Sequence, residues 1–390
     1  MSRNNLKTYG ESLNAQELQQ MLTFALRQND KLAQKGKRGT PICIWGTHGL
    51  GKTESILGFA KKNNWTTVYC APAQFEEMGD LHGIPEVYDP TPELPNSGDE
   101  YTVYRPPQWL KSAIQSADET KPGILILDDF NRAENRILQG CMQLLQMHAL
   151  FSWSLPARWQ IVLTANPEGG PYKVTEMDDA MLTRMMHVTM KFDAQSWALW
   201  AIEAGIDSRC IDFVLTYPEV VTGLRTTARS LTQFFQQIEG ITDLDNQNNL
   251  QLISILGKAT LETETVEQFL HFCKHVQNTL IQPEEILDAD DFKKHVAAKL
   301  KRIISGDGQG KRIDRLKTIC TRLMLHVTSE NYTPPKESKH KENMISFLLN
   351  EDMDAALRFN IHLHLANANN TGAKDLIRDP RLAHIILAGM

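Results

Sequence analysis

The chain has no long apolar run, no closely paired cysteines and no excess of positive charge. No stretch of about 18 consecutive apolar residues occurs, so we expect no membrane-spanning helix. The segment Met1–Gly10 is polar and lacks the apolar core of a signal peptide. The six cysteines are scattered without a C-x-x-C pair, which favours reduced, buried thiols in a cytoplasmic protein. A net charge of -6 gives no general attraction to nucleic acid.

The pattern of apolar residues predicts an α/β part followed by a helical part. At 390 residues, the chain is long enough for two or three domains. Strand and helix patterns alternate up to about Met190, which predicts a parallel sheet with helices on both faces. Beyond about Phe192 the apolar residues recur with a helical period. We therefore expect an α/β core over residues 1–192, a helical lid over 193–290 and a helical extension over 291–390.

Local signals place the elements of the α/β core. The expected strands are Ile42–Trp45, Val68–Cys70, Ile124–Leu127 and Ile161–Thr164, and a leading helix is expected over Asn14–Gln28. The prolines, asparagine and glycine between Asp89 and Glu100 exclude regular structure, and the β-prone flanks predict an inserted hairpin or extended loop. The polar stretch from Thr328 to Asn343 is typical of a linker or mobile loop.

The strongest signal is a glycine-rich segment between the first strand and a helical pattern. It fits G-x-x-x-x-G-K-[ST] at every fixed position and consists of Gly46, Thr47, His48, Gly49, Leu50, Gly51, Lys52 and Thr53. The glycines let the backbone wrap a polyphosphate without a Cβ clash, and the following helix N-terminus faces the anion. Lys52 can reach the β- and γ-phosphates, and the Thr53 hydroxyl can hold Mg²⁺. The segment therefore predicts a nucleoside triphosphate site.

Polar residues at two later strand ends complete the predicted site. Asp128 and Asp129 directly follow the apolar run Ile124–Leu127. Beside a phosphate loop, Asp128 is expected to bind Mg²⁺ and Asp129 to polarise the attacking water. Without such a loop, the same pattern would fit a strand that ends in a solvated acidic turn. Asn166 either contacts the γ-phosphate and orients the water, or simply starts a turn before Pro167.

The order of these motifs resembles the AAA+ ATPases and, within them, the MoxR group and its dynein-related relatives. The resemblance covers roughly residues 15–290. Phe130–Ala133 is similar to the group's D-E-[IF]-N-R-A, and Gly79–Gly83 is similar to its G-D-L-x-G. The resemblance implies a P-loop NTPase fold with a helical lid.

The resemblance also implies roles for single residues. Asn166 falls on sensor 1, and Arg184 falls on the arginine finger, which reaches the nucleotide of the neighbouring subunit. Arg225 falls on sensor 2, with Arg229 one turn later as a rival. The alternative role of Arg184 and of Arg225 is a surface salt bridge.

Two features leave the rate of hydrolysis and the client contacts open. The group usually has Asp-Glu where this chain has Asp128 and Asp129, and an aspartate carboxylate falls short by roughly 1 Å, which can cost about a hundredfold in rate. We therefore expect ATP binding, whereas the rate of hydrolysis stays open. The segment from Gln143 to Trp159 is expected to hold the group's short hairpin, although Phe151 and Trp153 fit core positions of the sheet equally well.

The sequence thus predicts a ring-forming ATPase, hexameric and cytoplasmic, that needs ATP and Mg²⁺ and remodels or activates a protein partner. The resemblance implies von Willebrand A domain proteins as one partner class. A nucleic-acid-remodelling motor and an ATP-gated scaffold with slow hydrolysis remain alternatives. The sequence contains no Asn-Lys-x-Asp element, which disfavours a GTPase. Gly306–Lys311 has the wrong spacing for a second phosphate loop. His362 and His364 lack a third ligand for a metal site.

Overall fold

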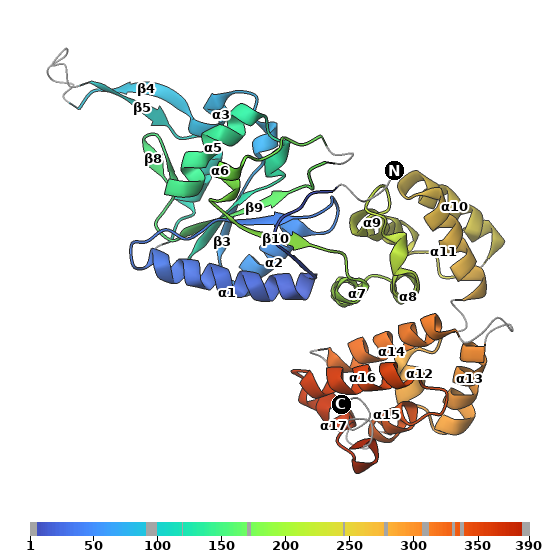
Figure 1. The fold of residues 1–390 in the computed structure, drawn as a ribbon. Helices are drawn as coiled ribbons and strands as arrows, with labels where there is room; N and C mark the ends of the chain where they lie inside the picture. The colour runs from blue at the N-terminus through green and yellow to red at the C-terminus, as the bar shows by residue number, and fades with distance from the viewer. Residues whose placement is uncertain are drawn as a thin grey trace. The chain divides into compact units, whose positions relative to one another are not determined.

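The computed structural model describes residues 6–90, 100–118, 120–169, 173–244, 246–276, 280–305, 312–329, 332–335 and 339–383. The chain divides into two compact units (Figure 1). The first contains Met1–Asp193 and the short segment Thr227–Arg229, and the second contains Ala194–Thr226 and Ser230–Met390. The finer division of the helical part at residue 290 stays a prediction.

A six-stranded parallel sheet forms the centre of the first unit. Its strand order is β1-β10-β2-β9-β6-β3. The strands are β1 (Glu11–Leu13), β2 (Ile42–Trp45), β3 (Thr66–Cys70), β6 (Gly123–Leu127), β9 (Trp159–Ala165) and β10 (Met186–Met190). The predicted parallel α/β fold is confirmed. β1 was not predicted; it pairs with β10 at one edge of the sheet.

The order of the strands decides which loops meet. β9 lies between β2 and β6, although it follows both of them in the sequence. Because all strands are parallel, their carboxyl ends lie at the same edge of the sheet. The segments after β2, β9 and β6 therefore stand side by side, in that order. They are the phosphate loop, Asn166 and the acidic pair.

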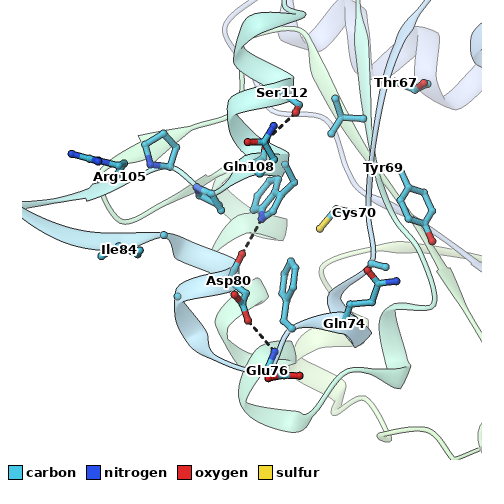
Figure 2. Close-up of a pocket in the computed structure, with 18 residues that line it drawn as sticks. Thr67, Tyr69, Cys70, Gln74, Glu76, Asp80, Ile84, Arg105, Gln108 and Ser112 are labelled. Carbon is cyan, nitrogen blue, oxygen red and sulfur yellow. Dashed lines mark hydrogen bonds between the residues drawn. The ribbon is translucent and has the colours of Figure 1, made fainter.

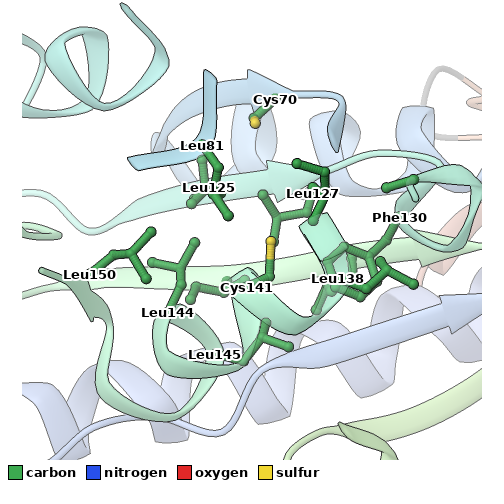
Figure 3. Packing of buried hydrophobic residues seen from close by; sticks show 14 of the residues in the cluster. Cys70, Leu81, Leu125, Leu127, Phe130, Leu138, Cys141, Leu144, Leu145 and Leu150 are labelled. Carbon is green, nitrogen blue, oxygen red and sulfur yellow. The ribbon is translucent and has the colours of Figure 1, made fainter. Parts of the chain in front are cut away.

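Helices cover both faces of the sheet (Figure 1). Alternate residues of each strand face opposite sides, so Ile42 and Ile44 belong to one apolar cluster and Cys43 and Trp45 to the other. The first cluster includes buried side chains of α1 (Ala15–Ala33) and α2 (Lys52–Asn63). The second includes those of α3 (Met78–His82), α4 (Gln108–Gln115), α5 (Asn135–Met147) and α6 (Asp179–Leu182). Figure 3 shows part of it, with Leu138, Cys141 and Leu144 of α5 packed beside Leu125 and Leu127 of β6.

Two antiparallel hairpins interrupt the alternating pattern. The first is formed by β4 (Ile84–Tyr88) and β5 (Tyr101–Arg105). Its predicted connecting loop lies mostly outside the described residues. The second is formed by β7 (Ala149–Leu150) and β8 (Trp153–Ser154).

The described residues of the second unit contain helices and no strand, as predicted. They form α7 (Ala194–Glu203), α8 (Ser208–Thr216), α9 (Ala228–Ile238, whose first residues belong to the first unit), α10 (Gln247–Thr260), α11 (Thr263–His275), α12 (Pro283–Leu287), α13 (Ala298–Ser305), α14 (Ile313–Thr328), α15 (His340–Leu348), α16 (Ala355–Asn367) and α17 (Thr371–Leu376). A π-helical turn, Lys293–Ala297, leads into α13. Among the described residues, no helix combines the length and the apolar character needed to cross a bilayer.

A buried ion pair joins α8 to α14 within the second unit. Arg322 of α14 lies 3.0 Å from Asp212 of α8, and both side chains are largely buried. Gln282 donates a hydrogen bond to the other oxygen of this carboxylate at 3.3 Å. Burial raises the pKa of Asp212 to about 6, although the Arg322 charge opposes that shift. This ion pair therefore connects a helix before residue 290 to a helix after it.

Candidate nucleotide-binding site

The phosphate loop connects β2 to α2 in a conformation that requires glycine. Gly51, directly before α2, has a φ of 89°, in the left-handed region that residues with a Cβ rarely adopt. Gly49 has a φ of 71°, and a Cβ on it would come within 2.6 Å of the Thr227 hydroxyl. The N–H groups of the first turn of α2 have no partner within that helix, so this terminus suits an anion.

Lys52 lies inside this loop rather than in solvent. Only 7% of its surface is exposed. Its ammonium donates hydrogen bonds to the carbonyl oxygens of Gly46 and Thr47, at 2.8 and 3.1 Å, and to the side-chain oxygen of Asn166 at 3.4 Å. Burial lowers the pKa of Lys52 to about 8, and the nearby charges of Asp129 and Asp128 oppose this shift. A buried cation therefore stands beside the end of β9.

Three hydroxyl groups surround the carboxylate of Asp128. Thr53 and Thr164 donate hydrogen bonds to its Oδ1, at 2.6 and 2.7 Å. The Tyr69 hydroxyl donates to its Oδ2 at 2.9 Å. Burial, then this bond to Asp128, raises the pKa of Tyr69 to about 12. The two residues predicted to bind the metal, Thr53 and Asp128, are therefore in direct contact.

Asp129 points toward Asn166. It adopts a left-handed conformation with a φ of 48°, and its backbone N–H donates to the Thr164 hydroxyl at 2.9 Å. Asn166 donates its side-chain amide to the Asp129 carboxylate, also at 2.9 Å. On the other side, Arg132 lies 3.3 Å from the same carboxylate. The Asn166 amide thus contacts both Lys52 and Asp129.

A second asparagine fixes Asn166. Asn131, which is fully buried, accepts the Asn166 backbone N–H at 2.9 Å and donates to the Asn166 carbonyl at 2.8 Å. Sequence reasoning did not single out Asn131, Thr164 or Tyr69 for this site. Asn131 and Thr164 lie inside the quoted motifs, which was a usable signal. Tyr69 had no local signal, because its role depends on β3 and β6 being paired.

The structure places the predicted arginines in three different settings. Arg184 follows α6, and its guanidinium donates hydrogen bonds to Gln146 of α5, at 3.3 Å, and to the Ala180 carbonyl. Arg225 donates to the carbonyls of Lys258 and Ala259 near the end of α10. The backbone N–H of Arg229 donates to the Gly49 carbonyl at 3.1 Å, and its charge helps to lower the pKa of Lys52. These contacts bring Arg229 to the phosphate loop.

The G-D-L-x-G segment anchors both hairpins. Gly83 has a φ of 89°, and a Cβ on it would lie 1.9 Å from the Arg105 carbonyl oxygen across the hairpin. The His82 ring packs against the rings of Tyr104 and Phe151, at 4.8 and 4.9 Å. Phe151 is 55% exposed at the turn of the second hairpin, whereas Trp153 is 9% exposed in the core. The predicted short hairpin is therefore present. Trp153 occupies a core position, and Phe151 lies exposed at the turn.

A groove of about 950 Å³ lies along the free edge of β3 (Figure 2). Tyr69 of β3 lines it, together with Asp80 of α3 and Trp109 of α4. The Trp109 indole N–H donates to the Asp80 carbonyl at 3.2 Å. The groove was not predicted and does not include the phosphate loop. Tyr69 nevertheless connects it to Asp128.

No protein-family model and no curated protein matches the chain. Solved structures of RuvB from Thermotoga maritima, one of them titled a Holliday junction branch migration motor, match with TM-scores of 0.34 to 0.37. One shares 11% identity over 78% of this chain and 90% of that chain, and a second shares 12% over 82% and 85%. The branch migration motor shares 12% over 75% and 77%.

The geometry of the chain itself is more informative. A buried central strand runs into a glycine loop that opens a helix, and an acidic pair follows a second buried strand at the same sheet edge. Asn166 lies between them and contacts the lysine and the second acid. The first unit therefore has the P-loop NTPase fold.

Proposed function

We propose that the chain is an AAA+ ATPase that binds ATP and Mg²⁺ at this loop and hydrolyses the terminal phosphoanhydride bond. The observation that carries the proposal is a pair of contacts at the same edge of the sheet: Lys52 contacts Asn166 at 3.4 Å, and Thr53 contacts Asp128 at 2.6 Å. A buried ammonium beside a glycine loop suits a polyphosphate, and two acids within reach suit a metal and a water.

The residues at the site fit Mg²⁺. The Thr53 hydroxyl and the Asp128 carboxylate supply the hard oxygen ligands that this ion prefers, and they already lie 2.6 Å apart. When bound, Mg²⁺ would offset charge on the β- and γ-phosphates. Tyr69 and Thr164 then serve as hydroxyl donors that orient the Asp128 carboxylate from behind.

The other polar residues have separate roles in this proposal. Lys52 exchanges its bonds to the loop carbonyls for bonds to the phosphates. Asp129 accepts a hydrogen bond from the attacking water, and Asn166, which donates to the Asp129 carboxylate, helps to orient that water. Because the aspartate is short and also pairs with Arg132, we expect slow turnover.

We further propose a hexameric ring in which Arg184 of one subunit reaches the nucleotide of the next. Its partly exposed guanidinium contacts Gln146 and Ala180 within its own chain. For the sensor 2 role, we favour Arg229 over Arg225. Arg229 is supported by its backbone contact with Gly49, whereas Arg225 is engaged with carbonyls at the end of α10.

The finer assignment is a MoxR-like ATPase that remodels or activates a protein client, with a von Willebrand A domain protein as one candidate. Exposed apolar residues on the two hairpins support contact with a protein. They are Ile84, Val87, Tyr88, Tyr101 and Phe151. A nucleic-acid motor is the alternative, and tight, salt-sensitive binding of DNA by the pure protein would favour it. The short Asp129 instead favours an ATP-gated scaffold with little turnover.

The function is tested by measuring binding and hydrolysis of ATP with Mg²⁺ in matched lysine variants. Lys52→Ala should abolish both, because it removes the buried ammonium at the phosphate loop. Lys61→Ala, on the exposed surface of the same helix, should leave both within about twofold of wild type. Unchanged ATP binding by the Lys52→Ala protein would refute the site. Binding by wild type with undetectable hydrolysis would favour the scaffold.

A further inference from the structure

His187 of β10 accepts a hydrogen bond on one ring nitrogen and donates one from the other. The Trp45 indole N–H lies 3.0 Å from His187 Nδ1, and His187 Nε2 lies 2.8 Å from the Leu182 carbonyl oxygen. An indole N–H can only donate and a carbonyl can only accept. The ring is therefore neutral, with its proton on Nε2. These two bonds make a directed chain from Trp45 through His187 to Leu182.

The two ends of this hydrogen-bond chain lie next to residues of the proposed ATP site. Trp45 is fully buried, is the last residue of β2 and directly precedes Gly46 of the phosphate loop. Leu182 is the last residue of α6, two positions before Arg184. The Leu182 carbonyl also accepts the backbone N–H of Met185 at 3.3 Å. The hydrogen bond from His187 therefore holds the turn that carries Arg184.

Tyr9 and Gly10, in the segment before α1, pack against this hydrogen-bond chain. The Tyr9 ring packs on those of Trp45 and His187, with centroids 4.8 and 5.7 Å apart. Its hydroxyl donates to buried Glu168 at 3.0 Å, two residues after Asn166. Gly10 has a φ of 77°, and a Cβ on it would lie 2.0 Å from the His187 carbonyl oxygen. Displacement of the His187 ring would disturb this packing, so the packing holds the ring in its position.

We propose that His187 is a positioning residue that ties the Arg184 turn to the strand carrying the phosphate loop. One subunit's phosphate loop would then be linked to the arginine that the same subunit offers to its neighbour. This inference rests on the proposed ring, in which Arg184 acts across a subunit boundary. The competing explanation is that His187 only fills space in the fold.

The test uses rings mixed from two inactive proteins. Lys52→Ala binds no ATP but still offers Arg184, whereas Arg184→Ala binds ATP but offers no arginine. Mixed, they should regain hydrolysis at the sites where both intact parts meet. His187→Phe keeps an aromatic ring of similar size but loses both hydrogen bonds, and it is added to one partner at a time.

Added to the Lys52→Ala partner, His187→Phe should lower the regained activity by about tenfold, because a misplaced guanidinium stabilises the transition state poorly. Added to the Arg184→Ala partner, it should change activity by less than about twofold. Equal loss in both mixtures, or greater loss in the second, would overturn the inference. If the unmodified pair regains nothing, the shared site fails and the inference fails with it.

Two further variants separate the hydrogen bonds from packing and from misfolding. His187→Gln places an amide N–H near the position of Nε2 but loses the acceptor for Trp45, so it should lose about as much activity as Trp45→Phe and less than His187→Phe. Trp45→Phe keeps the ring packing and removes the donor to Nδ1, so it should lower the activity of the same mixture by about threefold to fivefold. A Gln variant as weak as the Phe variant, or a silent Trp45→Phe, would contradict the hydrogen-bond chain.

Discussion

The side-chain amide of Asn166 donates to Asp129 at 2.9 Å, while its oxygen lies 3.4 Å from the Lys52 ammonium. A single residue thus contacts the cation expected to hold the phosphates and the acid expected to orient the water. Asn131 fixes the backbone of Asn166 on both sides, so this arrangement is rigid. A change at Asn166 or Asp129 should therefore affect hydrolysis more than binding, whereas loss of Lys52 should abolish both.

The first prediction concerns the length of the Asp129 side chain. Asp129→Asn should lower the steady-state rate of ATP hydrolysis by about a hundredfold or more, because an amide cannot accept the proton, while ATP binding is kept. Asp129→Glu extends the carboxylate by one methylene and should raise the rate by roughly tenfold. The rates are measured at saturating ATP. An Asn variant with the wild-type rate would exclude Asp129 from the reaction.

The second prediction concerns Tyr69. Tyr69→Phe removes one of the hydroxyl groups that orient Asp128, a loss of about 1 kcal/mol. The Mg²⁺ concentration that gives half-maximal hydrolysis should rise by roughly fivefold, since 1.4 kcal/mol corresponds to a factor of ten. Tyr88→Phe, on the exposed hairpin, is the matched control and should have no effect. An unchanged or lower Mg²⁺ requirement for Tyr69→Phe would contradict the role of the hydroxyl.

The third prediction is a pH dependence of ATP binding. Burial lowers the pKa of Lys52 to about 8, so the ammonium loses its proton as the pH rises through that value. The phosphates bind the protonated form, so affinity should be level just below pH 8. Above it, affinity should fall by up to about tenfold per pH unit. Equilibrium titrations between pH 7 and 9.5 measure this.

Lys52→Arg is the control for that titration. An arginine keeps its charge throughout this pH range, so any ATP affinity that the variant retains should be independent of pH. A wild-type affinity that stays level up to pH 9.5 would show that Lys52 remains protonated, and would contradict the prediction. A fall of equal steepness in the arginine variant would assign the effect to another group.

The fourth prediction concerns the buried ion pair of the helical unit. Arg322→Ala leaves the Asp212 carboxylate buried without its cation and should lower the free energy of unfolding by about 3 kcal/mol at pH 7.5. The folded state raises the pKa of Asp212, so it binds this proton more tightly than the unfolded chain does. The loss should therefore shrink as the pH falls toward 5, where Asp212 becomes neutral.

Urea unfolding followed by circular dichroism gives this free energy at both pH values. Arg302→Ala, on the exposed side of α13, is the matched control and should cost less than about 0.5 kcal/mol. Equal losses for the two variants would show that the pair contributes nothing. A loss for Arg322→Ala that grows at pH 5 would contradict the sign derived for Asp212.

Much of the phosphate site could be predicted because its signals are local. A buried strand, a glycine loop and a helix are contiguous in residues 42–63, and Asp128 follows four apolar residues directly. These elements form from their own sequence pattern. The structure brings their ends together through strand order alone.

The parts that were missed depend on distant partners. β1 has three residues with no apolar alternation, and its pairing with β10 defines it as a strand. His187 and Tyr69 gain their contacts from residues 142 and 59 positions away, which no local pattern reveals. The sequence pattern of the second hairpin gave Phe151 and Trp153 equivalent positions, but Phe151 lies in the turn with a φ of 51° and is exposed, whereas Trp153 is buried.

The most direct test of the account is the specific rate of ATP hydrolysis as a function of protein concentration. If a neighbouring copy completes each site, the rate per subunit should rise steeply with concentration and then level off. The same curve for Arg184→Ala should stay low throughout. A rate per subunit that is independent of concentration and unaffected by Arg184→Ala would contradict the shared site.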